Sequence, residues 1–255
     1  MKLTLLLLAI TSLTFADDPK ALMTERGKLL ASEDLAQMPT DIFKGGALAS
    51  MTHGWSFHPG QWDIVDGALR GYQMKKDNHS AAAFFALPWK NAVLQFDVKL
   101  DGCSQIVFCI DDPAAMRPAT STRPAQNRVE HLCRLIINKD GFSTQKDDHD
   151  HDGPDQNEPF GEVNEPIAKG EWKTVLIEVQ GNEMVTTIDG QTIIGAHPQV
   201  AADKAYISFG VTGYSNGFDK VPPLSASFRK FRIWEAKPNS AWTDNRKALT
   251  EKALK

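Results

Sequence analysis

The sequence has few cysteines, no excess of positive charge, and no long apolar run after its N-terminal segment. Of 255 residues only three are cysteines, and after residue 16 no apolar stretch is long enough to cross a bilayer. A disulfide-dense scaffold and a transmembrane segment in the mature chain are thereby excluded. The formal net charge is −4, so the composition provides no basic surface of the kind that binds nucleic acid.

The motifs of several enzyme classes are also missing. The chain has no G-x-S-x-G nucleophile elbow, no H-E-x-x-H metal motif, no phosphate-binding loop and no dinucleotide fingerprint. It also lacks an E-x-D-x-E strand motif, which would place two carboxylates on one face for a retaining glycosidase. Ordinary two-carboxylate glycoside hydrolysis is therefore disfavoured.

The N-terminus has the pattern of a secretory signal peptide. One lysine is followed by an apolar run from Leu3 to Ile10 and then by small and polar residues up to Ala16. The run is too short for a membrane-spanning helix, so residues 1–16 are predicted to be removed on export. We therefore expect a secreted or periplasmic protein.

The three cysteines cannot all pair within one chain. Cys109 and Cys133 lie in consecutive predicted strands, so a disulfide between them is conceivable in an exported protein. In the other interpretation, Cys103, Cys109 and Cys133 are small, buried apolar residues.

Most of the chain alternates with the period of two that is typical of strands. Residues 92–100 alternate between an apolar set that includes Phe96 and Val98 and a second set that includes Gln95 and Asp97. An Asp-Gly pair within residues 62–72 predicts a hairpin, and further short runs follow up to residue 236. Many short strands without intervening helices predict an all-β fold, a β-sandwich or jelly roll of two antiparallel sheets.

Both ends of the mature chain are predicted to be helical. Leu29, Leu30, Leu35 and Ala36 lie among charged residues, which suggests a short amphipathic helix within an N-terminal extension of residues 17–44. Residues 237–255 are polar and compatible with a C-terminal helical tail. The predicted β domain between them spans residues 45–236.

The most acidic segment is KDDHDHDGPD, residues 146–155. Asp148, Asp150 and Asp152 precede a glycine in the pattern D-x-D-x-D-G, with which a turning loop can wrap carboxylate oxygens around Ca²⁺. His149 and His151 in the same segment would favour a transition metal instead. The alternative is a solvated acidic turn without a metal.

A second group combines histidines, carboxylates and an arginine. His79 precedes one predicted strand, Asp111 and Asp112 end another, and His131 and Arg134 lie in the next. Histidine transfers protons near neutral pH, so these residues are candidates for catalysis, although a strand-end histidine can also be purely structural. Strand alternation places His131 and Arg134 on opposite faces unless a bulge intervenes.

Tryptophans form the third group. Trp55 and Trp62 lie at the first long loop and Trp89 follows a proline, and exposed tryptophans on a β-sandwich can stack on sugar rings. If they are buried, the same residues fill the core.

Four segments resemble, in this order, the 3-keto-disaccharide hydrolase family of exported bacterial proteins. They are GQWDIVDGALRG, AVLQFDVKLDG, KGEWKTVLIEVQGNEMVTTIDGQTI and ASFRKFRIWEA. The resemblance covers residues 45–236 and implies a concanavalin A-like or LamG-like jelly roll. The family's LFDG and GW signature is matched only loosely, by DIFKGGALASMTHGW.

The resemblance implies a specific chemistry. The ketone of a 3-keto-glycoside acidifies the proton on C2, so that a base can remove it and expel the C1 substituent, and water adds afterwards. Such a site needs a base, an acid and a cation for the enolate. His79, His131, Asp111 and Asp112 are the candidates for proton transfer or metal ligation, and Arg134 or a divalent metal is the candidate for the enolate, with no organic cofactor.

Two other classes of function stay open from the sequence. The same fold serves in non-catalytic carbohydrate-binding modules, which would present exposed tryptophans on a concave face. A scaffold or adhesion domain would have neither a row of exposed tryptophans nor a pocket in which His79 and His131 meet carboxylates.

Overall fold

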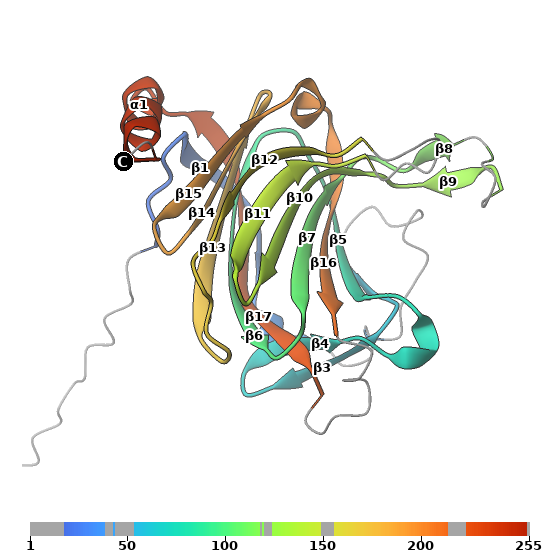
Figure 1. Ribbon diagram of the computed structural model, residues 1–255. Coiled ribbons are helices and arrows are strands. Elements are labelled where there is room, and N and C mark those ends of the chain that lie inside the picture. Colours follow the sequence, from blue (N-terminus) through green and yellow to red (C-terminus); the bar gives the residue numbers. More distant parts are fainter. Residues whose placement is uncertain are drawn as a thin grey trace, which may run out of the picture.

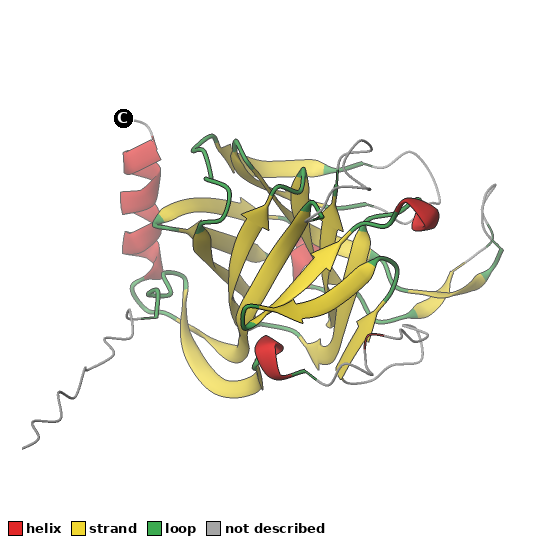
Figure 2. Cartoon of the chain, turned by 90° about the horizontal axis from the view of Figure 1, so that it is seen from below, coloured by secondary structure: helices red, strands yellow, loops and turns green. Residues whose placement is uncertain are grey.

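A computed structural model describes residues 18–38, 43, 54–117, 119, 124–148, 156–213 and 223–253. The predicted signal peptide lies outside this part. The described chain forms two large antiparallel sheets and a small two-stranded ribbon (Figures 1 and 2). The predicted all-β sandwich of antiparallel sheets is confirmed.

One sheet has eight strands. In spatial order seven of them are β15 (Gln191–Ala196), β14 (Glu183–Ile188), β13 (Trp172–Gln180), β6 (Ala92–Asp101), β17 (Ser225–Pro238), β4 (Ala68–Tyr72) and β3 (Gln61–Val65). The eighth, β1 (Thr24–Glu33), pairs with β17. The β3–β4 hairpin turns at Asp66 and Gly67, which both have positive φ, as expected from the Asp-Gly pair.

The other large sheet has seven strands. They are, in spatial order, β12 (Glu158–Val163), β11 (Gly141–Lys146), β10 (His131–Asn138), β7 (Gln105–Asp111), β16 (Lys204–Thr212), β5 (Ala81–Trp89) and β2 (Gly54–Phe57). The ribbon of β8 (Ala115–Arg117) and β9 (Gln126–Arg128) projects from this sheet between β7 and β10 (Figure 1). Short 3₁₀ helices occupy Leu35–Gln37, Lys75–Asp77 and Pro198–Ala201.

The core lies between the two large sheets and is rich in phenylalanine. Phe96 of β6 stacks on Phe108 of β7 at a centroid distance of 5.0 Å, and Phe209 of β16 contacts Phe228 of β17 at 4.7 Å. All four are buried. Their removal from water is the main stabilising term of the sandwich, and it leaves the outer face of each sheet for other contacts.

The three tryptophans predicted to stack on sugars pack into this core. Trp62 and Trp89 are only 2% and 7% exposed. Trp55 is half-buried, and its ring packs against Phe85 and Phe231 at centroid distances of 4.9 and 5.4 Å. The prediction that Trp62 and Trp89 are exposed platforms is therefore wrong, because the core buries their rings, whereas Trp55 is only partly buried against the same core.

The predicted N-terminal helix is also wrong, since residues 24–33 form strand β1. Strand β17 is 14 residues long, and β4 pairs only with its first part, Ser225–Phe228. Strand β1 pairs with the remaining part of β17, from Phe231 to Pro238. It thereby supplies hydrogen-bond partners to backbone N–H and C=O groups of β17 that β4 does not reach. The sandwich therefore begins before residue 45, and the amphipathic pattern serves a strand.

The predicted C-terminal helix is confirmed as α1 (Trp242–Ala253). The side-chain amides of Asn239 and Asn245 donate to the carbonyl of Leu22 at 3.0 and 2.8 Å, and the Trp242 indole donates to Glu183 at 3.1 Å. These bonds dock α1 on the N-terminal segment and on β14. No helix of the described chain has the length and apolar character needed to span a membrane.

Candidate functional site

A pocket of about 260 Å³ lies on the outer face of the seven-stranded sheet, and we call it the outer-face pocket. Its lining comes from four neighbouring strands, β5, β7, β10 and β16, and from the segment just before β5. The polar and titratable side chains of this lining are His79, Ser80, Gln105, Cys109, His131, Arg134 and Ser208. Three of the predicted site residues, His79, His131 and Arg134, are thus brought together.

A β-bulge places two of them on the same face. On β10, His131 lies opposite Asp111 of β7, whereas Cys133 lies opposite Ile110, so the two steps along β10 match one step along β7. The additional residue, Leu132, is buried in the core together with Cys133. The bulge that strand alternation required for His131 and Arg134 to share a site is therefore present.

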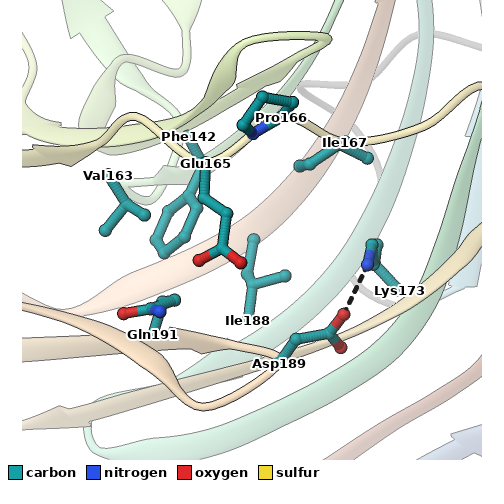
Figure 3. Close-up of a pocket in the computed structure, with 9 residues that line it drawn as sticks. All are labelled: Phe142, Val163, Glu165, Pro166, Ile167, Lys173, Ile188, Asp189 and Gln191. Carbon is teal, nitrogen blue, oxygen red and sulfur yellow. Dashed lines mark ion pairs between the residues drawn. The ribbon is translucent and has the colours of Figure 1, made fainter.

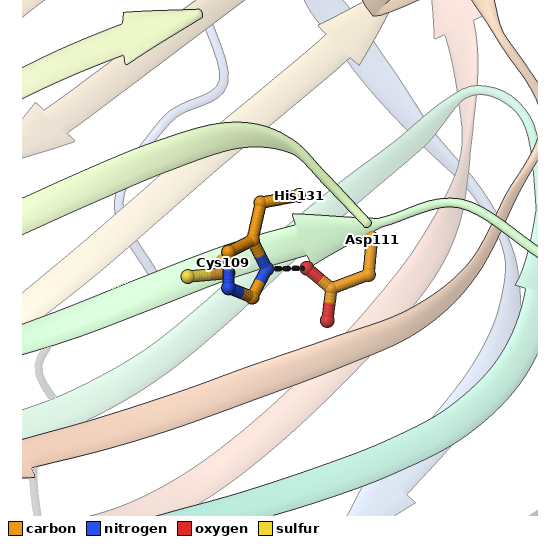
Figure 4. A group of neighbouring side chains, drawn as sticks. All are labelled: Cys109, Asp111 and His131. Atoms are coloured by element: carbon orange, nitrogen blue, oxygen red, sulfur yellow. Dashed lines mark hydrogen bonds and ion pairs between the residues drawn. The ribbon is translucent and has the colours of Figure 1, made fainter. Parts of the chain in front are cut away.

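Asp111 holds the imidazole of His131. The Asp111 Oδ1 and His131 Nδ1 atoms are 2.6 Å apart, and the Asp111 carboxylate is fully buried (Figure 4). Its other oxygen accepts a longer bond of 3.4 Å from the Ser208 hydroxyl. Because an ionised carboxylate can only accept, the proton between the two atoms lies on Nδ1.

The surroundings of His131 favour its charged form. Burial acts to lower the pKa of His131, but the neighbouring Cys109 sulfur and Asp111 carboxylate outweigh burial and raise the pKa well above its ordinary value. Asp111 thus both orients the ring and stabilises positive charge on it.

Cys109 completes a group that the sequence analysis did not recognise. Its Sγ, a carboxylate oxygen of Asp111 and a ring nitrogen of His131 all lie within 4.8 Å of one another (Figure 4). Thiolate, carboxylate and imidazole are all metal ligands, so the three side chains could together hold a metal ion. The signal in the sequence was the spacing of Cys109 and Asp111, which places both on one face of a strand.

The conceivable Cys109–Cys133 disulfide is not formed. Cys109 lines the outer-face pocket, whereas Cys133 points into the core on the opposite face of the sheet. All three cysteines are free and buried, as in the alternative interpretation.

His79 lies at the exposed edge of the pocket. Its Nδ1 is 2.8 Å from the backbone carbonyl oxygen of Ser80. A carbonyl oxygen only accepts hydrogen bonds, so Nδ1 carries the proton, and the Nε2 of a neutral ring is then an acceptor. This is the tautomer that a general base requires.

Arg134 is held by a carboxylate that the sequence analysis did not single out. Its guanidinium lies 2.5 Å from Asp147 Oδ2, and the Asp147 side chain is only 1% exposed. The backbone N–H of Asp147 donates to the carbonyl of Leu132, the bulge residue, at 3.0 Å. Asp147 therefore links the bulge to the position of the guanidinium.

Two predicted site residues lie elsewhere. Asp112 does not line the pocket, and its Oδ1 accepts from the backbone N–H of Glu130 at 2.8 Å, at the base of the β8–β9 ribbon. Asp148 accepts from the backbone N–H of Gln156 at 2.9 Å and so closes its own loop. Asp150 and Asp152 lie outside the described residues, so a metal site at these three aspartates stays a prediction.

A second, smaller cavity of about 40 Å³ lies between β11, β12 and the β14–β15 turn (Figure 3). Lys173 and Asp189 form an ion pair of 2.7 Å at its edge, and Phe142 and Ile188 supply apolar walls. The volume suffices for a few water molecules and is too small for a sugar ring. The outer-face pocket is the better candidate site.

Several solved structures share the fold at low sequence identity. An endo-β-galactosidase from Clostridium perfringens that releases GlcNAcα1-4Gal has a TM-score of 0.54 and 12% identity, covering 85% of this chain and 65% of the other. A galectin-like protein from Bacillus subtilis has a TM-score of 0.52 and 11% identity, covering 85% of this chain and 100% of the other. A LamA variant from Zobellia galactanivorans bound to laminaritriose and laminaritetraose has a TM-score of 0.51 and 12% identity, covering 83% and 100%.

The sequence itself identifies the family. No curated protein matches the chain in sequence. The family model described as a 3-keto-alpha-glucoside-1,2-lyase-like domain matches residues 39–233, a range that contains every strand of the outer-face pocket. The chain therefore belongs to the family of 3-keto-alpha-glucoside-1,2-lyase-like domains.

Proposed function

We propose that this protein is an exported enzyme that cleaves 3-keto-glycosides in the outer-face pocket. The observation that carries the proposal is the convergence of His79, His131 and Arg134 on one pocket from distant parts of the chain. Family membership supports the substrate class. The signal-peptide pattern of residues 1–16 supports action outside the cytoplasm, in the periplasm or medium.

His79 is the proposed general base. Its Nδ1 is bound to the Ser80 carbonyl, so its Nε2 can take the proton from C2 of the sugar. The electrons of that C–H bond first move onto the C3 ketone and form an enolate. They then return to form the C1–C2 double bond as the C1–O bond breaks, and the leaving oxygen takes up a proton from water. Addition of water to the resulting enone completes the net hydrolysis.

Positive charge opposite the base would stabilise the enolate oxygen. Arg134, held by Asp147, and His131, held by Asp111, both face the pocket and are fixed before substrate binds. Preorganised charge of this kind is often the largest contribution to a lowered barrier. The divalent metal expected from the sequence would act in the same way, and Cys109, Asp111 and His131 are its candidate ligands.

The position of the tryptophans weighs against the alternative of a non-catalytic carbohydrate-binding module. Such a module would use exposed aromatic platforms, whereas Trp55, Trp62 and Trp89 pack into the core. A polar pocket with two histidines is better suited to proton transfer than to stacking.

An aryl 3-keto-α-glucoside whose leaving group is coloured tests the proposal. We expect the mature protein to release the aryl alcohol, and His79→Gln to lower the rate by about 10²-fold or more while leaving the fold intact. His58→Gln is the matched control, because His58 is an exposed histidine outside the pocket lining. Folded wild-type protein that binds saccharides without turning over any 3-keto-glycoside would overturn the proposal in favour of a binding module.

A further inference from the structure

We infer that Cys109, Asp111 and His131 form a binding site for a thiophilic transition metal such as Zn²⁺ or Co²⁺. The inference deepens the proposed function, on which only the catalytic role of the metal depends. Binding of the metal itself stands on the arrangement of the three side chains.

The backbone gathers these ligands without help from a flexible loop. Cys109 and Asp111 are two residues apart on β7 and so point to the same face. His131 joins them from β10 because the bulge at Leu132 brings it opposite Asp111. All three candidate ligand atoms lie within 4.8 Å of one another, so small side-chain adjustments would bring them to a single ion.

The group of three candidate ligands is mostly buried but keeps one side open to the pocket, as in a catalytic metal site. Cys109 is 5% exposed and Asp111 is fully buried, whereas 23% of the His131 side chain is exposed. Cys109 and His131 line the pocket, whereas Asp111 lies buried behind them in the sheet. Three protein ligands with one position open to water or substrate are typical of catalytic zinc sites.

The donor atoms select the kind of metal. Ca²⁺ and Mg²⁺ prefer oxygen ligands only, whereas a thiolate with an imidazole and a carboxylate suits Zn²⁺ and other borderline or soft ions. This distinguishes the site from the acidic segment of residues 146–155, where Asp148 already closes its own loop through Gln156.

The surrounding charges tolerate a cation. The nearby guanidinium of Arg134 is paired with the buried carboxylate of Asp147, so its positive charge is compensated. Asp111 Oδ1 and His131 Nδ1 are 2.6 Å apart and share one proton, so a metal that displaces this proton would have an oxygen and a nitrogen ligand already side by side. Ser208 in turn donates to the second oxygen of Asp111.

A bound metal would give the pocket a fixed Lewis acid. Its charge would face the same space as Arg134 and lie across from His79 at the pocket edge. A ketone oxygen bound there would be polarised, and the charge of the enolate would be stabilised. His131 would then serve as a ligand, and proton transfer would rest with His79.

Titration of the mature, metal-free protein with Co²⁺ tests the site without any substrate. We expect one equivalent to bind, with a thiolate-to-cobalt charge-transfer band in the near ultraviolet and intense visible bands of a four- or five-coordinate ion. Cys109→Ser should abolish the charge-transfer band, and His131→Gln should weaken binding by about tenfold or more. Zn²⁺ should displace the cobalt and erase both sets of bands.

Two variants serve as controls. Cys103→Ala removes a thiol that belongs to the core, and Asp148→Asn alters the acidic segment, so both should bind Co²⁺ like the wild type. Binding without a charge-transfer band in the wild type, binding unchanged in Cys109→Ser, or binding lost in Asp148→Asn would each overturn the inference. The wild-type spectrum alone tests thiolate ligation if Cys109→Ser fails to fold.

The metal site and the proposed function fail separately. Co²⁺ bound with the expected spectrum, but no turnover of any 3-keto-glycoside, would overturn the proposed function and leave the metal site standing. Turnover that persists after chelation, together with no Co²⁺ binding, would overturn the metal site and leave the proposed function standing.

Discussion

His131 and Arg134 face the same pocket although three positions separate them on one strand, because β10 bulges at Leu132. In a regular strand, residues an odd number of positions apart point to opposite faces. The additional residue at the bulge shifts the alternation of side chains by one position, so the imidazole of His131 and the guanidinium of Arg134 lie on the same face of the sheet. Each is held by a buried aspartate, His131 by Asp111 and Arg134 by Asp147. Bulges are often found next to active sites, where they re-aim side chains.

Asp147 is predicted to act by positioning Arg134. Asp147→Asn keeps the size of the side chain and removes its charge, so Arg134 loses its partner and part of its fixed orientation. We expect a fall of about tenfold in kcat on a 3-keto-glycoside and a loss of about 1–3 kcal/mol in the free energy of unfolding. Steady-state kinetics and urea unfolding measure both. Asp147→Glu should recover part of the activity, and an unchanged kcat in Asp147→Asn would refute the positioning role.

Glu178 is predicted to anchor the N-terminal strand. Its buried carboxylate accepts the backbone N–H groups of Leu22, Met23 and Thr24 at 2.7–2.8 Å, and also the Thr24 hydroxyl. Glu178→Gln replaces an acceptor by a donor at one position, and we expect a loss of about 2–4 kcal/mol in the free energy of unfolding.

Limited proteolysis provides a second readout of the Glu178 anchor. Cleavage near residue 24 should become faster in Glu178→Gln, because β1 detaches from β17 more often. Glu171→Gln is the control and should behave like the wild type, because Glu171 is an exposed glutamate just before β13, the strand that contains Glu178. Equal cleavage rates in both variants would show that β1 is held by its pairing with β17 alone.

Lys204 is predicted to make stability depend on pH above neutrality. The residue is 1% exposed, and its ammonium donates to the carbonyls of Lys90, Val200 and Ala202 at 2.6–2.9 Å. Burial lowers the pKa of Lys204 from 10.5 to about 8. Between these two values the unfolded chain binds more protons at this group than the folded chain does, so the contribution of Lys204 to stability rises as the pH increases.

Lys204→Met isolates this contribution. The difference in the free energy of unfolding between wild type and variant should shift by about 1–3 kcal/mol in favour of the wild type from pH 8 to pH 10.5. All other titrating groups are common to both proteins and cancel in the difference. A difference that stays constant over this range would mean that the three carbonyl acceptors keep Lys204 charged throughout.

Cys103 and Cys133 are predicted to be unreactive in the folded protein. Burial raises the pKa of both thiols to about 12, so almost no thiolate is present near neutrality. Iodoacetamide at pH 8 should leave both unmodified in native buffer and alkylate both in urea, as read by peptide mass spectrometry. Cys109, which lines the pocket, should be protected by added Zn²⁺ if it is a ligand. Alkylation of Cys133 under native conditions would contradict its place in the core.

The sequence alone determined the class of fold and most of its strands. Alternation with a period of two and turns such as Asp66–Gly67 are properties of neighbouring residues, and they predicted the sandwich and its hairpins. The C-terminal helix was predicted from the polar, helix-compatible composition of residues 237–255. The same local chemistry pointed to His79, His131 and Arg134, because histidine and arginine are residues suited to proton transfer and to oxyanion binding.

Only the tertiary structure decided which of these residues meet and which faces they present. Strand β1 depends on β17 and on Glu178, which is 155 positions away from Met23, and no local pattern contains that partner. The bulge at Leu132 is a relation between two strands, as are the pairing of Arg134 with Asp147 and the grouping of Cys109 with Asp111 and His131. Local periodicity specifies how a segment alternates, whereas register and packing against distant segments specify which side is buried and which side forms the site.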